Sequence, residues 1–181
     1  AEPWKITLVD TGDASMTLAL GTSTTGTRAL DLSASGAAKT VTLTGSDAVA
    51  ITSATTDINA AAYAGAVTAE LTNTDDMTFQ VGTAATSIAV KGTNGAKTVT
   101  IDADAGSGTA GALTIANGGA VAGDIAVTGL EAGITISNAF VGTGDVSVTL
   151  GATTGQTVAL GTSTTGTRAV VANALTDTQS V

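Results

Sequence analysis

Six aspartates stand out in this sequence because each lies in or beside a turn between short apolar segments. They are Asp75, Asp76, Asp102, Asp104, Asp124 and Asp145. Calcium takes about six to eight oxygen ligands, which turn carboxylates and backbone carbonyls can supply. We therefore predict these aspartates as calcium ligands and Ca2+ as the cofactor. No single loop holds enough of them for a whole shell, so neighbouring chains or neighbouring coils are expected to share ligands. The competing interpretation is that the aspartates are solvated turn-formers.

The residue types that most enzymes need are missing. The sequence contains no histidine and no cysteine, which removes the commonest general base and the thiolate ligands of metal sites. A serine nucleophile would have no histidine to activate it, and no glycine-rich phosphate loop is present. Acids are plentiful enough for a glycosidase pair, but the few aromatic residues are scattered. We predict that the protein is not an enzyme, and that Trp4 is a core plug or an anchor between subunits.

The charge balance limits the expected partners. Fifteen acidic residues against six basic ones give a formal net charge of −9. Because no basic cluster is present, nucleic acid is not an expected partner, and an anionic lipid surface would repel the chain. No run of about eighteen apolar residues occurs, so no transmembrane segment is predicted. The expected partner is the protein itself, with a cell-surface polysaccharide as a second.

An eleven-residue phrase, Ala-Leu-Gly-Thr-Ser-Thr-Thr-Gly-Thr-Arg-Ala, occurs twice. The copies run from Ala19 to Ala29 and from Ala159 to Ala169, and the same offset aligns Leu30 with Val170. Self-similarity of this kind indicates a repeat architecture. Because identical local sequences have the same turn chemistry, we predict the same strand–turn–strand conformation for both copies.

Short bursts of alternating apolar and polar residues, closed by Gly, Asn or Asp, predict an all-β protein. Thr, Val and Ile fill these bursts, as a pleated surface favours. The predicted strands are Ile6–Val9, Met16–Leu20, Ala29–Leu32, Thr40–Thr44, Val49–Thr52, a strand at Ile58, Val67–Thr72, Met77–Val81, Ser87–Lys91, Thr98–Asp102, Ala112–Ala116, Asp124–Thr128, Gly133–Ser137, Asp145–Leu150, Thr157–Leu160 and Arg168–Val171. After Ile58 we expect a short helical turn at Ala60–Ala64, capped by Asp57 and closed by Gly65.

The composition favours a β-solenoid, in which short coils stack along an axis. Hydrophobic residues make up 43% of the chain but aromatic residues only 2%, so the core consists of Val, Ile, Leu and Ala. Stacked aliphatic side chains fill the narrow interior of such a fold, and recurring wording (Lys39-Thr-Val-Thr42 and Lys97-Thr-Val-Thr100) fits repeated coils. The alternative is a β-sandwich of short antiparallel strands. We assign residues 1–181 to one β-rich repeat domain. This domain is also compatible with a segment of a longer repetitive protein.

One count does not fit a simple coil. Thirteen strand intervals separate Ile6 from its repeat equivalent Val146. This number divides evenly by neither two nor three strands per coil. Either the strands near Asp57–Val67 are miscounted, or the long repeat reports a tandem domain instead of a whole number of coils.

The texture of the chain resembles that of bacterial S-layer and RTX-type surface proteins. The resemblance rests on Thr/Ala/Gly-rich strings such as Asp57–Leu71 and Gly95–Asp102, and it covers nearly the whole chain. The stretches Gly118–Ile125 and Gly142–Val146 are similar to parts of the RTX calcium nonapeptide, without its full spacing or tandem repetition. The resemblance implies a secreted protein on a bacterial cell surface.

Three functions compete on this basis. The first is a structural, self-assembling component of an S-layer lattice or extracellular filament, in which exposed strand edges join neighbours. The second is the stalk or a binding segment of a large secreted adhesin. The third is ice binding, because bursts such as Thr40/Thr42/Thr44 and Thr98/Thr100 would array hydroxyls on one face.

Overall fold

In the computed structural model, the described residues contain sixteen short strands, which form two parallel sheets, and no helix. The structure describes residues 4–8, 14–22, 26–35, 39–53, 56–72, 75–91, 97–105, 109–116, 124–131, 135–138, 144–151, 155–159 and 166–172. Within these residues no helix is long and apolar enough to cross a membrane.

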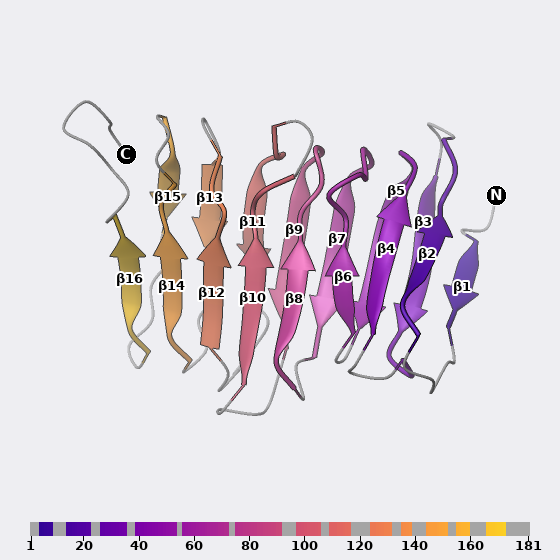
Figure 1. Cartoon of the computed structure of the whole chain (residues 1–181), viewed down its shortest axis with the longest axis horizontal. Coiled ribbons are helices and arrows are strands. Elements are labelled where there is room, and N and C mark those ends of the chain that lie inside the picture. The colour runs from indigo at the N-terminus through magenta and orange to yellow at the C-terminus, as the bar shows by residue number, and fades with distance from the viewer. Residues whose placement is uncertain are drawn as a thin grey trace.

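The odd-numbered strands form one sheet, called here the odd sheet, and the even-numbered strands form the other, the even sheet (Figure 1). The odd sheet contains β1 (Lys5–Thr7), β3 (Thr27–Leu32), β5 (Ala48–Ser53), β7 (Val67–Leu71), β9 (Thr86–Val90), β11 (Leu113–Ala116), β13 (Thr135–Asn138) and β15 (Thr157–Ala159). The even sheet contains β2 (Met16–Ala19), β4 (Thr40–Thr44), β6 (Asp57–Asn59), β8 (Met77–Gln80), β10 (Thr98–Asp102), β12 (Asp124–Thr128), β14 (Val146–Thr149) and β16 (Arg168–Val171).

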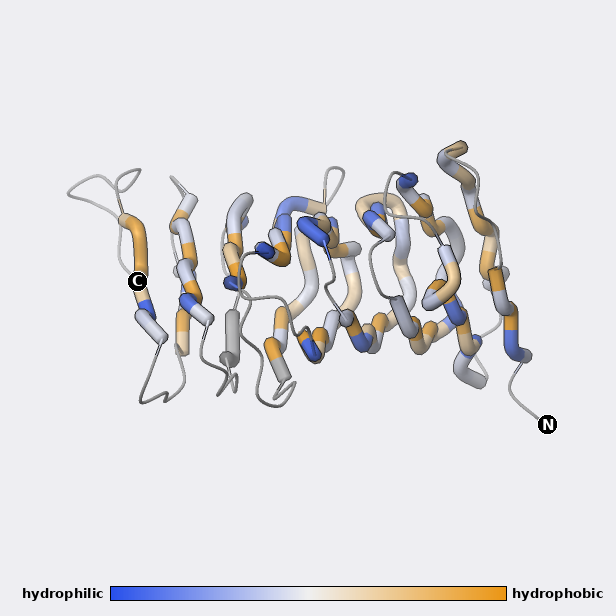
Figure 2. The backbone as a smooth tube through the Cα atoms, turned by 90° about the horizontal axis from the view of Figure 1, so that it is seen from below, coloured by the Kyte–Doolittle hydropathy of each residue, from blue (hydrophilic) through white to orange (hydrophobic). Residues whose placement is uncertain are grey.

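Each coil of the chain adds one strand to each sheet, and the coils stack into a rod (Figures 1 and 2). Every pairing among the described strands is parallel. This confirms the predicted β-solenoid. The antiparallel sandwich is wrong because strands that follow one another in sequence never pair; each pairs with the strand one coil away.

The core consists of columns of mostly aliphatic side chains that face inward from successive coils. One column of the even sheet, in register from β4 to β14, is Val41, Ile58, Phe79, Ile101, Val127 and Val148. All six are essentially inaccessible to solvent, whereas the alternate positions carry Thr, Ser, Asp and other mostly polar residues. Burying one large aliphatic side chain contributes about 1.5–3 kcal/mol to the free energy of folding. The stacked columns can therefore stabilise the fold although the chain has few aromatic residues.

The strand predictions are confirmed over the described residues, with ends that agree to within two residues; the predicted ends Val9, Gly133 and Leu160 lie outside the described residues. The predicted helical turn after Ile58 is wrong. The amide of Tyr63 donates to the carbonyl of Ala60 at 2.8 Å, and the amide of Ala61 donates to Asn59 Oδ1 at 3.0 Å. These bonds close a reverse turn around the corner, because Asn59 supplies the side-chain acceptor that favours a turn over a helix.

The two copies of the duplicated phrase lie in opposite sheets. The first spans the end of β2 and the start of β3, and the second spans the end of β15 and the start of β16. Strands flank the connection in both copies; the connections at 23–25 and 160–165 lie outside the described residues, so the shared turn conformation stays a prediction. The count of thirteen is therefore correct. With two strands per coil, an odd number of intervals moves the second copy into the other sheet.

Glycines allow successive coils to approach closely at the corner that leads from the even sheet to the odd sheet. A Cβ atom at Gly45 would collide with the carbonyl of Gly21, and one at Gly82 with the carbonyl of Tyr63. The amide of Ser46 donates to the carbonyl of Gly21 at 2.8 Å. The corner is thus a ladder of backbone contacts that continues the sheets around the turn.

Candidate assembly surfaces

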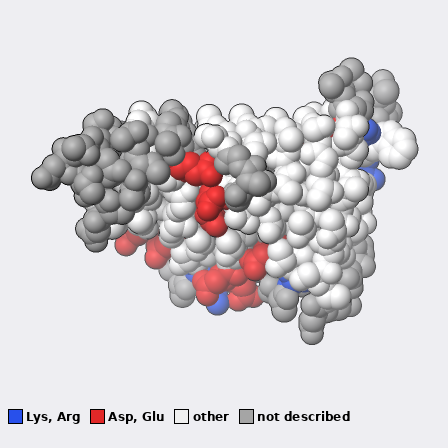
Figure 3. Space-filling model, turned by 45° about the horizontal axis from the view of Figure 1, so that its top comes forward, with Lys and Arg blue, Asp and Glu red and all other residues white. Residues whose placement is uncertain are grey.

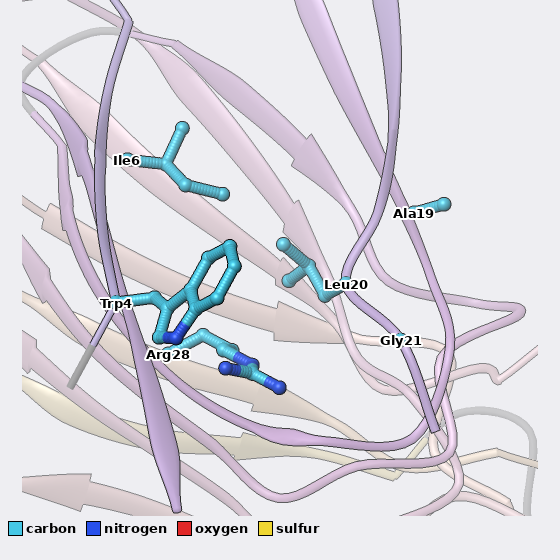
Figure 4. A pocket seen from close by; sticks show the side chains of 6 residues that line it. All are labelled: Trp4, Ile6, Ala19, Leu20, Gly21 and Arg28. Atoms are coloured by element: carbon cyan, nitrogen blue, oxygen red, sulfur yellow. The ribbon is translucent and has the colours of Figure 1, made fainter. Parts of the chain in front are cut away.

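At the N-terminal end of the rod, inward-facing side chains of the core are only partly covered. The edge strands β1 and β2 each have only one neighbour among the described strands, β3 and β4. Between them lies an open hollow of about 290 Å³, lined by Trp4, Ile6, Ala19, Leu20, Gly21 and Arg28 (Figure 4). Trp4 lies level with Arg28 in an inward-facing column, yet 72% of its surface is exposed. The predicted core plug is therefore wrong, and the role of an anchor between subunits stays a prediction.

A buried ion pair lies beside the hollow at the N-terminal end of the rod. The side chain of Asp47 is fully buried; its Oδ2 accepts a hydrogen bond from Arg28 Nε at 2.8 Å and forms an ion pair with Arg28 Nη2 at 2.7 Å. The guanidinium also lies 5.6 Å from the ring centroid of Trp4 (Figure 4). A cation in this position is attracted electrostatically by the face of the ring. Because Asp47 Oδ1 has no hydrogen-bond partner among the described residues, Arg28 is the main compensation for its charge.

Tyr63 extends this network one coil further. Its hydroxyl donates to the backbone carbonyl of Asp47, and the whole side chain is buried. Burial, together with the nearby charge of Asp47, raises the pKa of Tyr63 to about 12, although Arg28 opposes the shift. The network therefore fixes the corner after β4 to the corner after β6.

The C-terminal end is likewise an open core layer. The strands β15 and β16 each have only one neighbour among the described strands. Val170 continues an inward-facing column from Val127 and Val148, yet it is 41% exposed. Arg168, the repeat equivalent of Arg28, donates through Nη1 to the carbonyls of Gly144 and Thr167, each at 2.9 Å. Gly144 occupies the repeat position of Trp4. Arg28 therefore lies beside an aromatic ring, whereas Arg168 donates to a backbone carbonyl at the equivalent position.

Four of the six predicted calcium ligands lie at one corner of the rod, where the chain enters the even sheet. Asp76, Asp124 and Asp145 stand just before or at the first residue of β8, β12 and β14, and Asp75 precedes Asp76. Asp102 and Asp104 lie at the opposite corner, where β10 ends. Figure 3 shows acidic side chains in several separate groups on the face in view. The structure therefore does not bring the six aspartates together.

The aspartates at the entry corner bind the backbone of the next coil. Each accepts, through Oδ1, a hydrogen bond from an amide one coil further on: Asp76 from Thr98 at 2.9 Å, Asp124 from Asp145 at 2.9 Å and Asp145 from Thr167 at 2.7 Å. Asp57 does the same for Thr78 at 2.7 Å. Bonds from an amide to a carboxylate are charge-assisted and stabilise the charged form. These aspartates consequently act as links between coils.

The remaining contacts of the predicted ligands are local. Lys97 Nζ lies 3.1 Å from Asp75 and 3.6 Å from Asp76, and these carboxylates raise the pKa of Lys97. Asp102 Oδ1 accepts from the amide of Asp104 at 3.1 Å. Within the described ranges, no three acidic side chains are grouped as a metal site would require. Calcium binding, including ligands shared with a neighbouring chain, stays a prediction.

The sequence did not identify Asp47 or the role of Arg28. The signal was present in part, because Arg28 belongs to the duplicated phrase and Asp47 follows the turn residues Gly45 and Ser46. What joins them is the register of β3 with β5, which brings Thr27 opposite Ala48. A period of alternation predicts that both segments are strands, but not that they are neighbours.

The fold and the two open ends define a β-solenoid whose coil stacking does not close at either end of its described strands. Comparisons with protein-family models, with curated proteins and with solved structures give no match.

Proposed function

We propose that this protein is a structural component of a bacterial cell surface that assembles with copies of itself into a lattice or filament. The observation that carries the proposal is the pair of open ends. The two exposed large hydrophobic residues among the described part of the chain, Trp4 and Val170, both lie in inward-facing columns at the two ends of the rod.

The physical reason is that an open end combines two attractions. The end strands present unpaired backbone donors and acceptors, which template the addition of another strand. The exposed ends of the core columns add apolar area whose burial drives association. The flanks of the rod lack this combination, because their strands are paired on both sides and their outer positions are largely small and polar.

The alternative functions use the same rod differently. An adhesin stalk would need the ends covered by further parts of a longer chain, so assembly of this chain alone distinguishes the two. For ice binding, Thr40 and Thr42 do lie on the outer face of the even sheet. Their rows, however, continue into Asp57 and Asn59, and the second row reaches Asp102, so the hydroxyl array is interrupted. The interruption favours the structural role.

Sedimentation velocity over a wide concentration range, with negative-stain microscopy of the same samples, tests the proposal. We expect species that grow with concentration and appear as rods or sheets. A protein that stays monomeric up to about millimolar concentration, with and without divalent cations, would contradict it, since interfaces weaker than that contribute only about 4 kcal/mol.

A further inference from the structure

We propose that the assembly contact is a head-to-tail stack of two copies, in which β15 pairs with β1 and β16 pairs with β2 of the next copy. This inference rests on the proposed self-assembly and adds the surface, the polarity and the register. It would extend both sheets as continuous parallel ladders across the junction. The occupant of each open end is thus a second copy of this chain.

The duplicated phrase supplies the first argument, because one of its copies is already covered. By the offset that aligns Ala19 with Ala159, β15 (Thr157–Ala159) is the equivalent of Thr17–Ala19 of β2. Within the chain, β2 pairs on its C-terminal side with β4, so that Thr17 lies opposite Thr42 and Leu18 opposite Leu43. The same surface recurs on β15, where no described strand covers it. The strand that fits β15 should therefore resemble β4.

The first strand of the chain, β1, resembles β4 in this way. The segment Ile6-Thr7-Leu8 repeats the pattern of Val41-Thr42-Leu43: an aliphatic residue, a threonine and a leucine. Ile6 and Leu8 pack on the core as Val41 and Leu43 do, but both remain partly exposed. Placing β1 on β15 in the β2–β4 register sets Thr7 opposite Thr157 and Leu8 opposite Val158. Each apolar side chain then meets another apolar side chain.

The even sheet fits in the same way. By the same offset β16 corresponds to β3, whose C-terminal neighbour is β5, with Leu30 opposite Ile51. The apolar–small–apolar pattern of Val49-Ala50-Ile51 recurs as Met16-Thr17-Leu18 in β2. The corresponding register across the junction places Leu18 of the next copy opposite Val170. The exposed end of the even-sheet column would thereby be covered.

The distribution of charge is compatible with stacking along the axis. Among the described residues, the aspartates that line the two corners belong to the coils from β6 to β14, one coil or more away from the edge strands β2 and β16. A head-to-tail contact keeps these groups apart, whereas a contact between flanks would bring them together. For these described side chains, the stacked arrangement therefore has the smaller repulsion.

Charged substitutions at the two ends test the polarity. Trp4→Asp blocks the N-terminal end and Val170→Asp the C-terminal end, while Thr68→Asp, on the outer face of β7, is the matched control. We expect each end variant alone to lose association by at least about 10-fold and the control to assemble normally. An equimolar mixture of the two end variants should form dimers and stop, since one partner keeps an open N-terminal end and the other an open C-terminal end.

Homodimers of either end variant alone would overturn the head-to-tail polarity while leaving self-assembly intact. Loss of assembly in Thr68→Asp, with both end variants normal, would place the contact on a flank and overturn the inference. Absence of assembly in the unmodified protein would instead defeat the proposed function itself. Circular dichroism of each variant confirms that its β signal is retained.

A disulfide test measures the register without relying on charged variants. The sequence has no cysteine, so Thr7→Cys/Thr157→Cys introduces the only two thiols. Opposed positions on neighbouring strands fall within the Cα separation of about 4.4–6.8 Å that a disulfide accepts. Mild oxidation should give a ladder of linked chains. The pair Thr7→Cys/Ala159→Cys, two residues out of register, should not; equal linking by both pairs would contradict the proposed register.

Discussion

Arg28 and Arg168 show how a single residue of a repeat acquires a different role in each copy. They occupy the same position of an identical phrase, yet Arg28 pairs with the buried carboxylate of Asp47 and Arg168 bonds to backbone carbonyls. The difference follows from the neighbouring coils: Asp47 lies one coil after Arg28, whereas the carbonyl of Gly144, one coil before Arg168, accepts from Arg168.

The two arginines form a natural matched pair for mutation. Removing one partner of a buried ion pair leaves the other charge uncompensated, which costs about 3–5 kcal/mol. We expect Arg28→Ala to lower the free energy of unfolding by this amount and Arg168→Ala to lower it clearly less. Urea unfolding at a protein concentration too low for assembly measures both. Equal losses would show that the Asp47 pair contributes nothing beyond the common scaffold.

Tyr63 provides a spectroscopic readout of the same network because it is the only tyrosine. Its pKa is raised to about 12 in the folded protein, mainly by burial, against about 10 for an exposed tyrosine. The raised value means that the tyrosine contributes stability below about pH 10, and that this contribution is lost as the pH rises from about 10 to about 12. An absorbance titration should show one late transition in buffer and one near pH 10 in urea. In Tyr63→Phe the alkaline loss of stability should be smaller; an unchanged loss would assign it to other groups.

At the scale of the elements, the positions of the strands could be predicted from the sequence, but their neighbours could not. Alternation of Thr with Val, Ile or Leu reports only that a segment is extended with one face buried. Pairing depends on corner lengths, and these vary: one coil runs only from Val41 to Ile58, whereas another runs from Ser87 to Thr114. The turn at Ala60–Tyr63 escaped prediction for a similar reason, because Asn59 and the packing of Tyr63 outweigh the helix preference of alanine.

The corner glycines allow a test in which conformation and contact are separated. Gly26 and Gly45 both have positive φ angles, of 101° and 113°, but a Cβ at Gly26 would meet nothing within 4 Å whereas one at Gly45 would collide with Gly21. Gly26→Ala should cost only the conformational penalty, about 1–2 kcal/mol. Gly45→Ala should cost a further ~1–3 kcal/mol, the range for overpacking. Thermal unfolding of the two variants checks this; equal losses would mean that the corner relaxes freely.

The hydrogen bonds that aspartate side chains accept predict a loss of stability in acid. The hydrogen bond from the amide of Thr98 lowers the pKa of Asp76, and bonds from Ser33 lower the pKa of Asp31. Because both values are depressed in the folded state, their stabilisation is present above the usual aspartate pKa of about 3.9 and is lost as the pH falls below it. Urea midpoints measured from about pH 6 to about pH 2.5 should fall below about pH 4. Asp76→Asn should show a shallower fall, and an identical slope would mean that this link carries no charge-dependent stability.

At the scale of the whole molecule, we predict that divalent cations affect assembly more than folding. The aspartates of the entry corner are engaged with the next coil of the same chain, and we expect cations to act by neutralising the net charge of −9 per chain, which relieves the repulsion between stacked copies. Adding a chelator to assembled material should reduce particle size while the β signal in circular dichroism persists. Particle size that is unchanged at low salt would show that the acids only keep the protein soluble.

The odd number of strands in the long repeat also determines what a longer array would look like. Thirteen strands amount to six and a half coils, so each period, such as that from Ala19 to Ala159, ends half a revolution away from where it began. A side chain on the outer face of one sheet in one period would lie on the outer face of the other sheet in the next period. An array built on this spacing has an approximate two-fold screw axis, and a tendency to bend in one period is cancelled in the following one. Such a rod would stay straight and present its surface chemistry to both sides in turn, although every period carries the same sequence.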